Sequence, residues 1–453
     1  MLLNGGCAWQ QYTAKPLRPE TYVAEFEQKQ LGSEELRQFL AERGIKTEVW
    51  PPGAWNVEAL ELAALYLHSE LVLARAEIDI AKAQEISAGA RPNPDLNLDV
   101  EHHSDTPGDR TPWSIGPSLD WVFERGDKRA ARLERAAAQT ERARIDLRRK
   151  VWEVRRGVRD RCLEYHDAMS RIDGLKAQSE VLEEGVRLLH RREELGLTSS
   201  FEVSSMRVEA QRAQLARSSA EAKVQTAQAA LASALGVPLT ALKDAKLDTV
   251  LFDSLPLEDA LNRESLQRRA LTARTDLRRA VQDYAVAEAA LREEIAKQYP
   301  DFTLSPGYFF DQTDNIWKLG AAFLLPILNR NEGPIAEAQA RREFAAHRVE
   351  SAQAAVIGEV QIARAVYLAT RRSAAEAGAI VDSLSEQEQK VRREFELGET
   401  DRLAMVRAQL ETANARMVER ELITEVWRGV FRLEDATQSV LRPGVSTEAM
   451  SAP

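Results

Sequence analysis

The sequence contains one arrangement of segments written twice. Pro94–Leu98 opens a predicted strand pair in the first copy, and Pro300–Leu304 opens one in the second copy, 206 positions later. Glu194–Thr198 (ELGLT) is echoed by Glu396–Thr400 (ELGET), 202 positions later. Each copy shows the periodicity of a helix, two alternating strands, a very long helix and a shorter returning helix. A duplication of this kind predicts a symmetric wall built around an axis.

Composition favours long helices. Ala, Glu, Arg, Leu and Gln dominate, and the 453 residues include only 22 Gly and 17 Pro. The net charge is −10, and acidic and basic residues are mixed without a basic stripe, which argues against nucleic acid as the main partner. Because the sequence has no run of about 18 apolar residues, we expect no transmembrane helix.

Five consecutive segments are expected along the chain. The first is an extended N-terminal arm with a short helix near Ser33–Arg43 and a candidate lipid-anchored start. A helix-strand-strand-long helix-return helix repeat follows, and a linker joins it to a second such repeat, which precedes a C-terminal tail. In that order, the segments are residues 1–56, 57–246, 247–257, 258–436 and 437–453.

Four segments alternate apolar and polar side chains with the period of a strand. Each spans about 9–11 residues, the length that a tilted strand needs to cross a bilayer. Alone, each alternation favours a soluble sandwich strand. However, four strands cannot close a barrel, and open sheet edges do not survive in lipid, so several chains must combine their strands. The residues expected to face lipid are Leu96, Leu98, Trp113, Leu119, Trp121, Phe302, Leu304, Tyr308, Trp317, Leu319 and Phe323.

The positions of proline support the helices and complicate the strands. No proline occurs from 118 to 237 or from 335 to 442. Asp127–Leu195 is therefore expected as one helix of 69 residues, roughly 100 Å long. Val57–Arg91, with Asn56 as N-cap, and Phe201–Leu235 are expected as single helices of 35 residues, which would match the long helix if stacked end to end. Pro117 and Pro306 are expected at strand ends or bulges.

Several segments resemble the TolC-like outer-membrane efflux channels, and within that family the CzcC-like heavy-metal subgroup. The most specific is Leu325–Gly333 (LPILNRNEG), which is followed by Ile335–Ala338. Glu124–Arg132 (ERGDKRAAR) and Ala90–Pro94 (ARPNP) resemble the corresponding segments of the first repeat. The resemblance extends over roughly residues 57–436.

This resemblance implies a mainly α fold with a small β part. Three chains would form a coiled-coil α-barrel across the periplasm and a shared 12-stranded transmembrane β-barrel in the outer membrane, four strands from each chain. Such a channel is not an enzyme and carries no cofactor. Its expected partners are two further copies of the chain, outer-membrane lipid, a periplasmic adaptor and a proton-driven inner-membrane pump. Heavy-metal cations are the expected substrate, and drugs or other small molecules are the alternative.

The same resemblance assigns roles to the turns between the long and the returning helices. The turns are expected to contact the adaptor, although simple helix C-caps would show the same pattern. They comprise Leu195, Gly196, Leu197, Thr198, Leu397, Gly398, Glu399 and Thr400. Nearby charged residues are candidates for a gate held by ion pairs between helices, or are solvated surface charges. These are Glu202, Asp401, Arg402 and Arg407.

The two cysteines of the sequence have different predicted roles. Cys7 follows small residues near the start, as at a lipoprotein processing site, so it is a candidate lipid anchor or an ordinary cysteine. Cys162 lies in a helical run and is expected to be a small, partly buried apolar residue.

No constellation of residues predicts catalysis or metal binding. His102 and His103 are neighbours on a strand and should point to opposite faces, so we do not expect them to share an ion. The remaining histidines lack the spacing of a metal site, and no phosphate-binding Gly-rich loop occurs. A soluble coiled-coil scaffold is the competing function from another class, but it leaves the aromatic residues on the alternating strands without a role.

Overall fold

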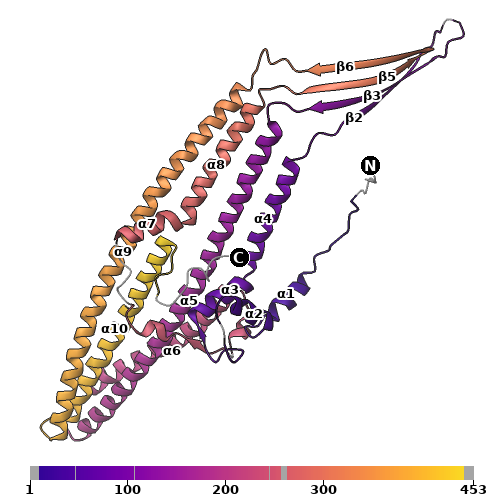
Figure 1. The fold of residues 1–453 in the computed structure, drawn as a ribbon. Helices are drawn as coiled ribbons and strands as arrows, with labels where there is room; N and C mark the ends of the chain where they lie inside the picture. The colour runs from indigo at the N-terminus through magenta and orange to yellow at the C-terminus, as the bar shows by residue number, and fades with distance from the viewer. Residues whose placement is uncertain (1–9, 46, 107, 244, 257–262, 443–453) are drawn as a thin grey trace.

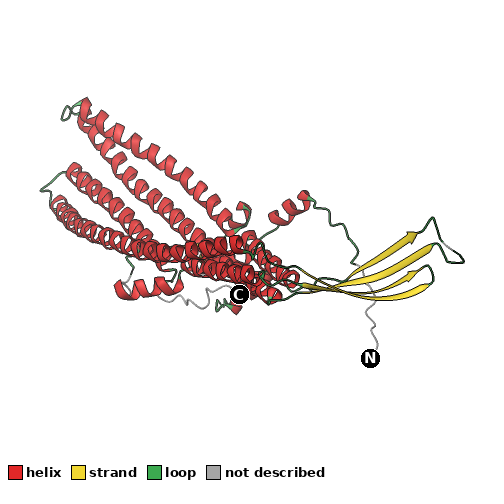
Figure 2. Cartoon of the chain, turned by 90° about the horizontal axis from the view of Figure 1, so that it is seen from above, coloured by secondary structure: helices red, strands yellow, loops and turns green. Residues whose placement is uncertain are grey.

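The computed structural model describes residues 10–45, 47–106, 108–243, 245–256 and 263–442. Long helices run side by side, and a four-stranded sheet projects from one end of them (Figure 1). Figure 2 shows the same separation, with the strands at one end and the helices extending away from it. Within the described residues, no helix has the length and apolar character needed to cross a membrane.

The two repeats have the same order of elements. The first contains α3 (Val57–Leu67), α4 (Ser69–Ala88), β2 (Asp95–His102), β3 (Trp113–Phe123), α5 (Lys128–Glu194) and α6 (Ser200–Leu235). The second contains α7 (Arg263–Ala273), α8 (Thr275–Ala296), β5 (Phe302–Asp311), β6 (Asp314–Phe323), α9 (Glu332–Glu396) and α10 (Arg402–Thr437). The mainly α fold with a small β part is therefore confirmed.

Shorter elements lie beside the middle of the helices. They are α1 (Pro19–Glu27), α2 (Glu34–Glu42), β1 (Trp55–Asn56), η1 (Leu239–Leu242), β4 (Leu247–Asp248) and η2 (Val250–Asp253). The expected short helix near Ser33 is α2, whose N-terminus is capped by the Ser33 side chain. The segment expected as a linker contributes β4, which pairs with β1, and the buried Phe252 of η2.

The long helices form as predicted. α5 has 67 residues and α9 has 65, and each is preceded by a residue in the left-handed conformation, Asp127 with φ 58° and Asn331 with φ 63°. Gly196 and Gly398, with φ 70° and 76°, follow the ends of these helices in the turns. The duplication is therefore visible in the backbone, at positions where a left-handed conformation starts or stops a helix.

The prediction of one continuous helix from Val57 to Arg91 is wrong. His68 adopts an extended conformation (φ −79°, ψ 121°) and separates α3 from α4. Its ring nitrogen Nδ1 accepts a hydrogen bond from the Glu70 N–H at 3.3 Å. Lys29 Nζ donates at 2.8 Å to the Leu67 carbonyl, a group that a continuous helix would bond internally. The same Nζ donates at 3.3 Å to the carbonyl of Gly236, the C-cap of α6. Arg274, 206 positions after His68, breaks the second repeat in the same way.

The sheet is antiparallel, in the order β2-β3-β5-β6. The expectation that Pro117 and Pro306 lie at strand ends or bulges is wrong, because both lie inside strands, where they pair with Leu98 and Leu319. Neither proline is among the paired positions between β3 and β5. Proline has no N–H and cannot donate a hydrogen bond to the neighbouring strand. The break in pairing therefore lies between β3 and β5, and the same register continues on both sides of it.

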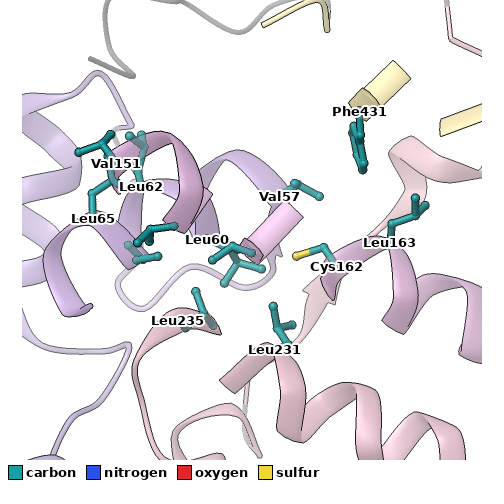
Figure 3. Close-up of a cluster of buried hydrophobic side chains, with 14 of the residues drawn as sticks. Val57, Leu60, Leu62, Leu65, Val151, Cys162, Leu163, Leu231, Leu235 and Phe431 are labelled. Atoms are coloured by element: carbon teal, nitrogen blue, oxygen red, sulfur yellow. The ribbon is translucent and has the colours of Figure 1, made fainter. Parts of the chain in front are cut away.

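The main hydrophobic core lies halfway along the helices, where the shorter elements cover them. Leu60 and Leu65 of α3 pack there with Leu231 of α6 and Phe431 of α10 (Figure 3). Cys162 of α5 is a small apolar residue of this core, as expected, but it is fully buried and not partly buried. Burial raises the pKa of its thiol, so the thiol stays protonated and unreactive.

Candidate functional site: the sheet and the helical tips

The register of the sheet collects the predicted lipid-facing side chains on one face. Leu96 is paired with Leu119, Trp121 with Leu304, and Tyr308 with Trp317. Because side chains alternate along each strand, paired residues share a face and the apolar positions of all four strands coincide. Most of these side chains are exposed, and an apolar patch of this extent on a sheet requires a partner or a lipid surface.

The opposite face carries all the charged residues of the four strands. They are Asp95, Asp99, Glu101, Asp120, Asp311, Asp314 and Lys318. Several join in hydrogen bonds across strands: Asn97 donates to Asp120 at 2.8 Å, and Ser114 donates to Asp311 at 2.7 Å. One face of the sheet is therefore apolar and the other is polar and predominantly acidic.

His102 and His103 lie on opposite faces, as predicted. The His102 ring packs against Trp113 on the apolar face, with ring centroids 4.6 Å apart. His103 Nε2 lies 3.0 Å from Ser114 Oγ on the polar face. Within the part of the chain that the structure describes, no group of three or more His, Cys, Asp or Glu side chains could hold a metal ion.

The sheet and the helical layer both have open edges in a single chain. β2 and β6 are the outer strands of the four-stranded sheet. Near the sheet the helices contact one another in the order α4-α5-α8-α9, and near the far end in the order α6-α5-α10-α9. Unpaired strand edges are a hazard that proteins normally cover. The single chain therefore has the geometry of a segment of a larger wall.

The eight predicted tip residues lie together at the end of the helices remote from the sheet (Figure 1). After α5, the Leu197 N–H bonds to the Arg192 carbonyl at 2.8 Å; after α9, the Glu399 N–H bonds to the Glu394 carbonyl at 2.8 Å. These bonds, with the glycines in the left-handed conformation, are Schellman caps. Leu195, Leu197 and Leu397 are exposed on the turns, so each tip presents apolar side chains to solvent.

Two of the four gate candidates form ion pairs between helices. Asp401 lies 2.7 Å from Arg192 of α5, and Arg402 lies 2.6 Å from Glu184 of α5. The Ala404 N–H bonded to the Asp401 carboxylate lowers the pKa of that carboxyl group against the effect of burial, and the charges of Arg192 and Arg407 lower it further.

The other two candidates do not take part in these pairs. Glu202 accepts a hydrogen bond from Thr198 within its own turn. Arg407 of α10 lies six residues after the N-cap Asp401, and its charge lowers the pKa of Asp401. Sequence reasoning missed Glu184 and Arg192, because charges on a helix of this composition are too numerous to identify the two that face α10. Cys7 lies outside the described residues.

Part of this chain matches a family of known proteins. Residues 63–237 match the family described as outer membrane efflux protein. This match covers α4, β2, β3, α5 and α6, that is, most of the first repeat. No curated protein matches the sequence.

Solved structures share the fold of this chain over 84% to 98% of its length. A membrane protein from Pseudomonas aeruginosa has a TM-score of 0.69 at 17% identity, covering 84% of this chain and 92% of that one. The outer membrane protein VceC from Vibrio cholerae has a TM-score of 0.68 at 18% identity, covering 84% and 96%. The CmeC outer membrane channel from Campylobacter jejuni has a TM-score of 0.66 at 14% identity, covering 98% and 93%. At these identities the likeness establishes the fold.

Proposed function

We propose that this chain is one third of an outer-membrane exit duct that serves a tripartite efflux pump. The observation that carries the proposal is the sheet, whose apolar and polar faces are separated in all four strands and whose outer edges are open. A closed ring of twelve such strands, four from each of three copies, satisfies every backbone edge and places the apolar face against lipid. The polar face then lines a water-filled lumen, and the long helices extend the lumen into the periplasm.

The duct performs no chemistry in this proposal. Its work is to conduct substrate that an inner-membrane, proton-driven pump delivers through a periplasmic adaptor. The exposed leucines at the tips support adaptor contact there, since an apolar side chain at the end of a helical hairpin is free to enter a partner's groove. If Cys7 is acylated, its lipid would add a second anchor in the same membrane.

Heavy-metal cations are the substrate that we favour. The support is the likeness of Leu325–Gly333 to the CzcC-like subgroup and the acidic polar face, which attracts cations along the exit path. A duct for drugs or other small molecules is the second candidate, since the pump and the adaptor would select the cargo in either case.

Paired substitutions on adjacent residues of the strands test the proposal. Leu119→Asp and Phe323→Asp place a charge on the apolar face, whereas Ser118→Asp and Ala322→Asp place one on the polar face of the same strands. We expect the first two variants to be lost from the outer-membrane fraction and the two controls to assemble as detergent-solubilised trimers. A wild-type protein that is monomeric without detergent, or four variants that behave alike, would contradict the duct.

A further inference from the structure

A cavity of about 710 Å³ lies between the long helix α5, the returning helix α10 and residues 246–253, which contain β4 and η2. Phe252 of η2 forms part of its wall, and the Phe252 ring contacts those of Trp427 and Phe431 of α10, with centroids 5.4 Å and 5.9 Å apart. These contacts join one wall of the cavity to the main hydrophobic core. Small-molecule sites in proteins have volumes of about 300–1,000 Å³, so the cavity has the size of such a site.

His166 of α5 is a buried part of the cavity wall. Its ring nitrogen Nδ1 lies 3.1 Å from Thr249 Oγ1, and Nε2 lies 3.7 Å from Asp253 Oδ1, so the ring joins α5 to residues 246–253. Burial lowers the pKa of His166, and the charge of Arg420 lowers it further. Asp253 and Asp167 raise this pKa by less, so the ring is neutral at pH 7.

Charged side chains of both signs line the cavity, and most of them have no partner. They are three carboxylates and two cations: Asp173, Asp248, Asp253, Lys246 and Arg420. All five are exposed, and among the described residues only Asp253 has an ion-pairing group within 4 Å, which is the ring of His166. Nearby charges on the same two helices do pair, as Asp167 of α5 does with Arg428 of α10 at 3.5 Å. Charges that stay unpaired around a cavity are available to a ligand, and complementarity requires that ligand to carry both signs.

The balance of these charges defines the ligand further. Because His166 is neutral, the three carboxylates and two cations leave one negative charge in excess. The guanidinium of Arg420 presents the paired donors that a carboxylate binds, and aspartate oxygens accept hydrogen bonds from ammonium groups. The described carboxylates do not form a group that could hold a metal ion. One carboxylate and two ammonium groups, which are the charged groups of a basic amino acid, therefore complement the cavity.

We infer that the cavity binds a basic amino acid, whose carboxylate contacts Arg420 and whose ammonium groups contact Asp173 and the aspartates of residues 246–253. The ligand then touches α5 of the first repeat, α10 of the second repeat and the segment between the repeats. A molecule that binds only the folded chain stabilises this arrangement. Every contributing residue belongs to one chain, so the site does not depend on the assembly of copies. It adds to the wall of the proposed duct a binding role that passive conduction does not need.

L-Lysine is the probe for this site, and isothermal titration calorimetry of the full chain in detergent at neutral pH measures its binding. We expect saturable binding of one molecule per chain. Cadaverine lacks the carboxylate of the probe, and L-norleucine lacks its second ammonium group. Each should bind at least about tenfold more weakly than L-lysine, because each leaves charges of the cavity without a partner.

Substitutions test the two residues that the inference assigns to opposite ends of the ligand. Arg420→Gln and Asp173→Asn should each weaken L-lysine binding at least about tenfold. Arg416→Gln is the matched control, since Arg416 is also exposed on α10, one turn before Arg420, but does not line this cavity. It should bind L-lysine as the wild type does.

Two results would overturn the inference while leaving the proposed duct intact. One is the absence of saturable L-lysine binding to the folded wild-type chain, or equal affinity of that chain for L-lysine and cadaverine. The other is equal L-lysine affinity of the wild type and both cavity variants, with circular dichroism showing that all of them are folded. The comparison of L-lysine with cadaverine uses only the wild type, so it decides the question even where a variant fails to fold.

Discussion

Arg442 Nη2 lies 2.7 Å from Glu61 Oε1, although almost the whole described chain separates the two residues. Both side chains are buried, and they belong to a larger network in the central core. Glu61 also binds Arg155 at 3.0 Å, while Arg442 contacts Glu434 at 3.2 Å and Glu434 binds Arg159 at 2.8 Å. The network joins the start of the first repeat, the long helix α5 and the segment that follows α10.

Arg442→Ala should be strongly destabilising, because it leaves the carboxylates of Glu61 and Glu434 buried with less positive charge. Breaking a buried pair by removing one partner costs about 3–5 kcal/mol. Urea unfolding followed by circular dichroism measures the change. Arg428→Ala is the matched control, since this partly exposed arginine pairs with Glu425 and Asp167 and should cost less than about 1 kcal/mol. If the two changes lower the free energy of unfolding equally, the buried network makes no special contribution to stability.

The same network predicts loss of stability in acid. Burial raises the pKa of Glu61, but the guanidinium groups of Arg442, Arg155 and Arg159 outweigh it, so the pKa lies below the ordinary value of 4.5. A carboxyl group whose pKa is lowered in the folded state stabilises the fold at any pH above its ordinary pKa. This contribution is lost as the pH falls through the pKa of the folded state. We therefore expect melting temperatures measured between pH 7 and pH 3 to decrease once the pH is below about 4.5. Glu61→Gln should be less stable at pH 7 and less sensitive to acid, and an unchanged acid slope would contradict the assignment.

The glycines at the tips provide a third prediction. Gly196→Ala and Gly398→Ala add a Cβ that meets no atom within 4 Å, so the only cost arises from the positive φ. That cost is about 1–2 kcal/mol and should loosen the turn rather than unfold the chain. We expect lower export in cells with unchanged trimer content. Gly157→Ala in α5 also meets no atom but lacks a positive φ, so it should leave export unchanged. Full export by both tip variants would argue against adaptor contact at the tips.

The fold was predictable from the sequence where one local signal dominated. The absence of proline defined α5 and α9, and the alternation of apolar side chains defined the four strands. The break at His68 was not predictable, because the apolar period continues through it and the groups that stabilise it, Lys29 and Gly236, are distant in sequence. For the same reason the buried network was missed, since nothing local distinguishes Arg159 or Arg442 from the many exposed arginines.

The ion pairs near the tips lead to the last prediction. Asp401→Asn removes the charge that Arg192 binds, yet keeps an oxygen that can cap α10. Arg402→Ala removes the pair with Glu184, so the two changes together remove both of these ion pairs between α10 and α5 near the tip. Each exposed pair contributes less than about 1 kcal/mol, so the double variant should fold normally.

If these pairs hold the duct closed, the conductance of single channels in planar bilayers should rise in the double variant at low salt. High salt screens the pairs and should bring the wild type closer to the variant. Arg217→Ala breaks a pair with Glu221 inside α6 and is the control, which should conduct as the wild type does. Equal conductance of the double variant and the wild type at low salt would assign these charges to the surface instead of a gate.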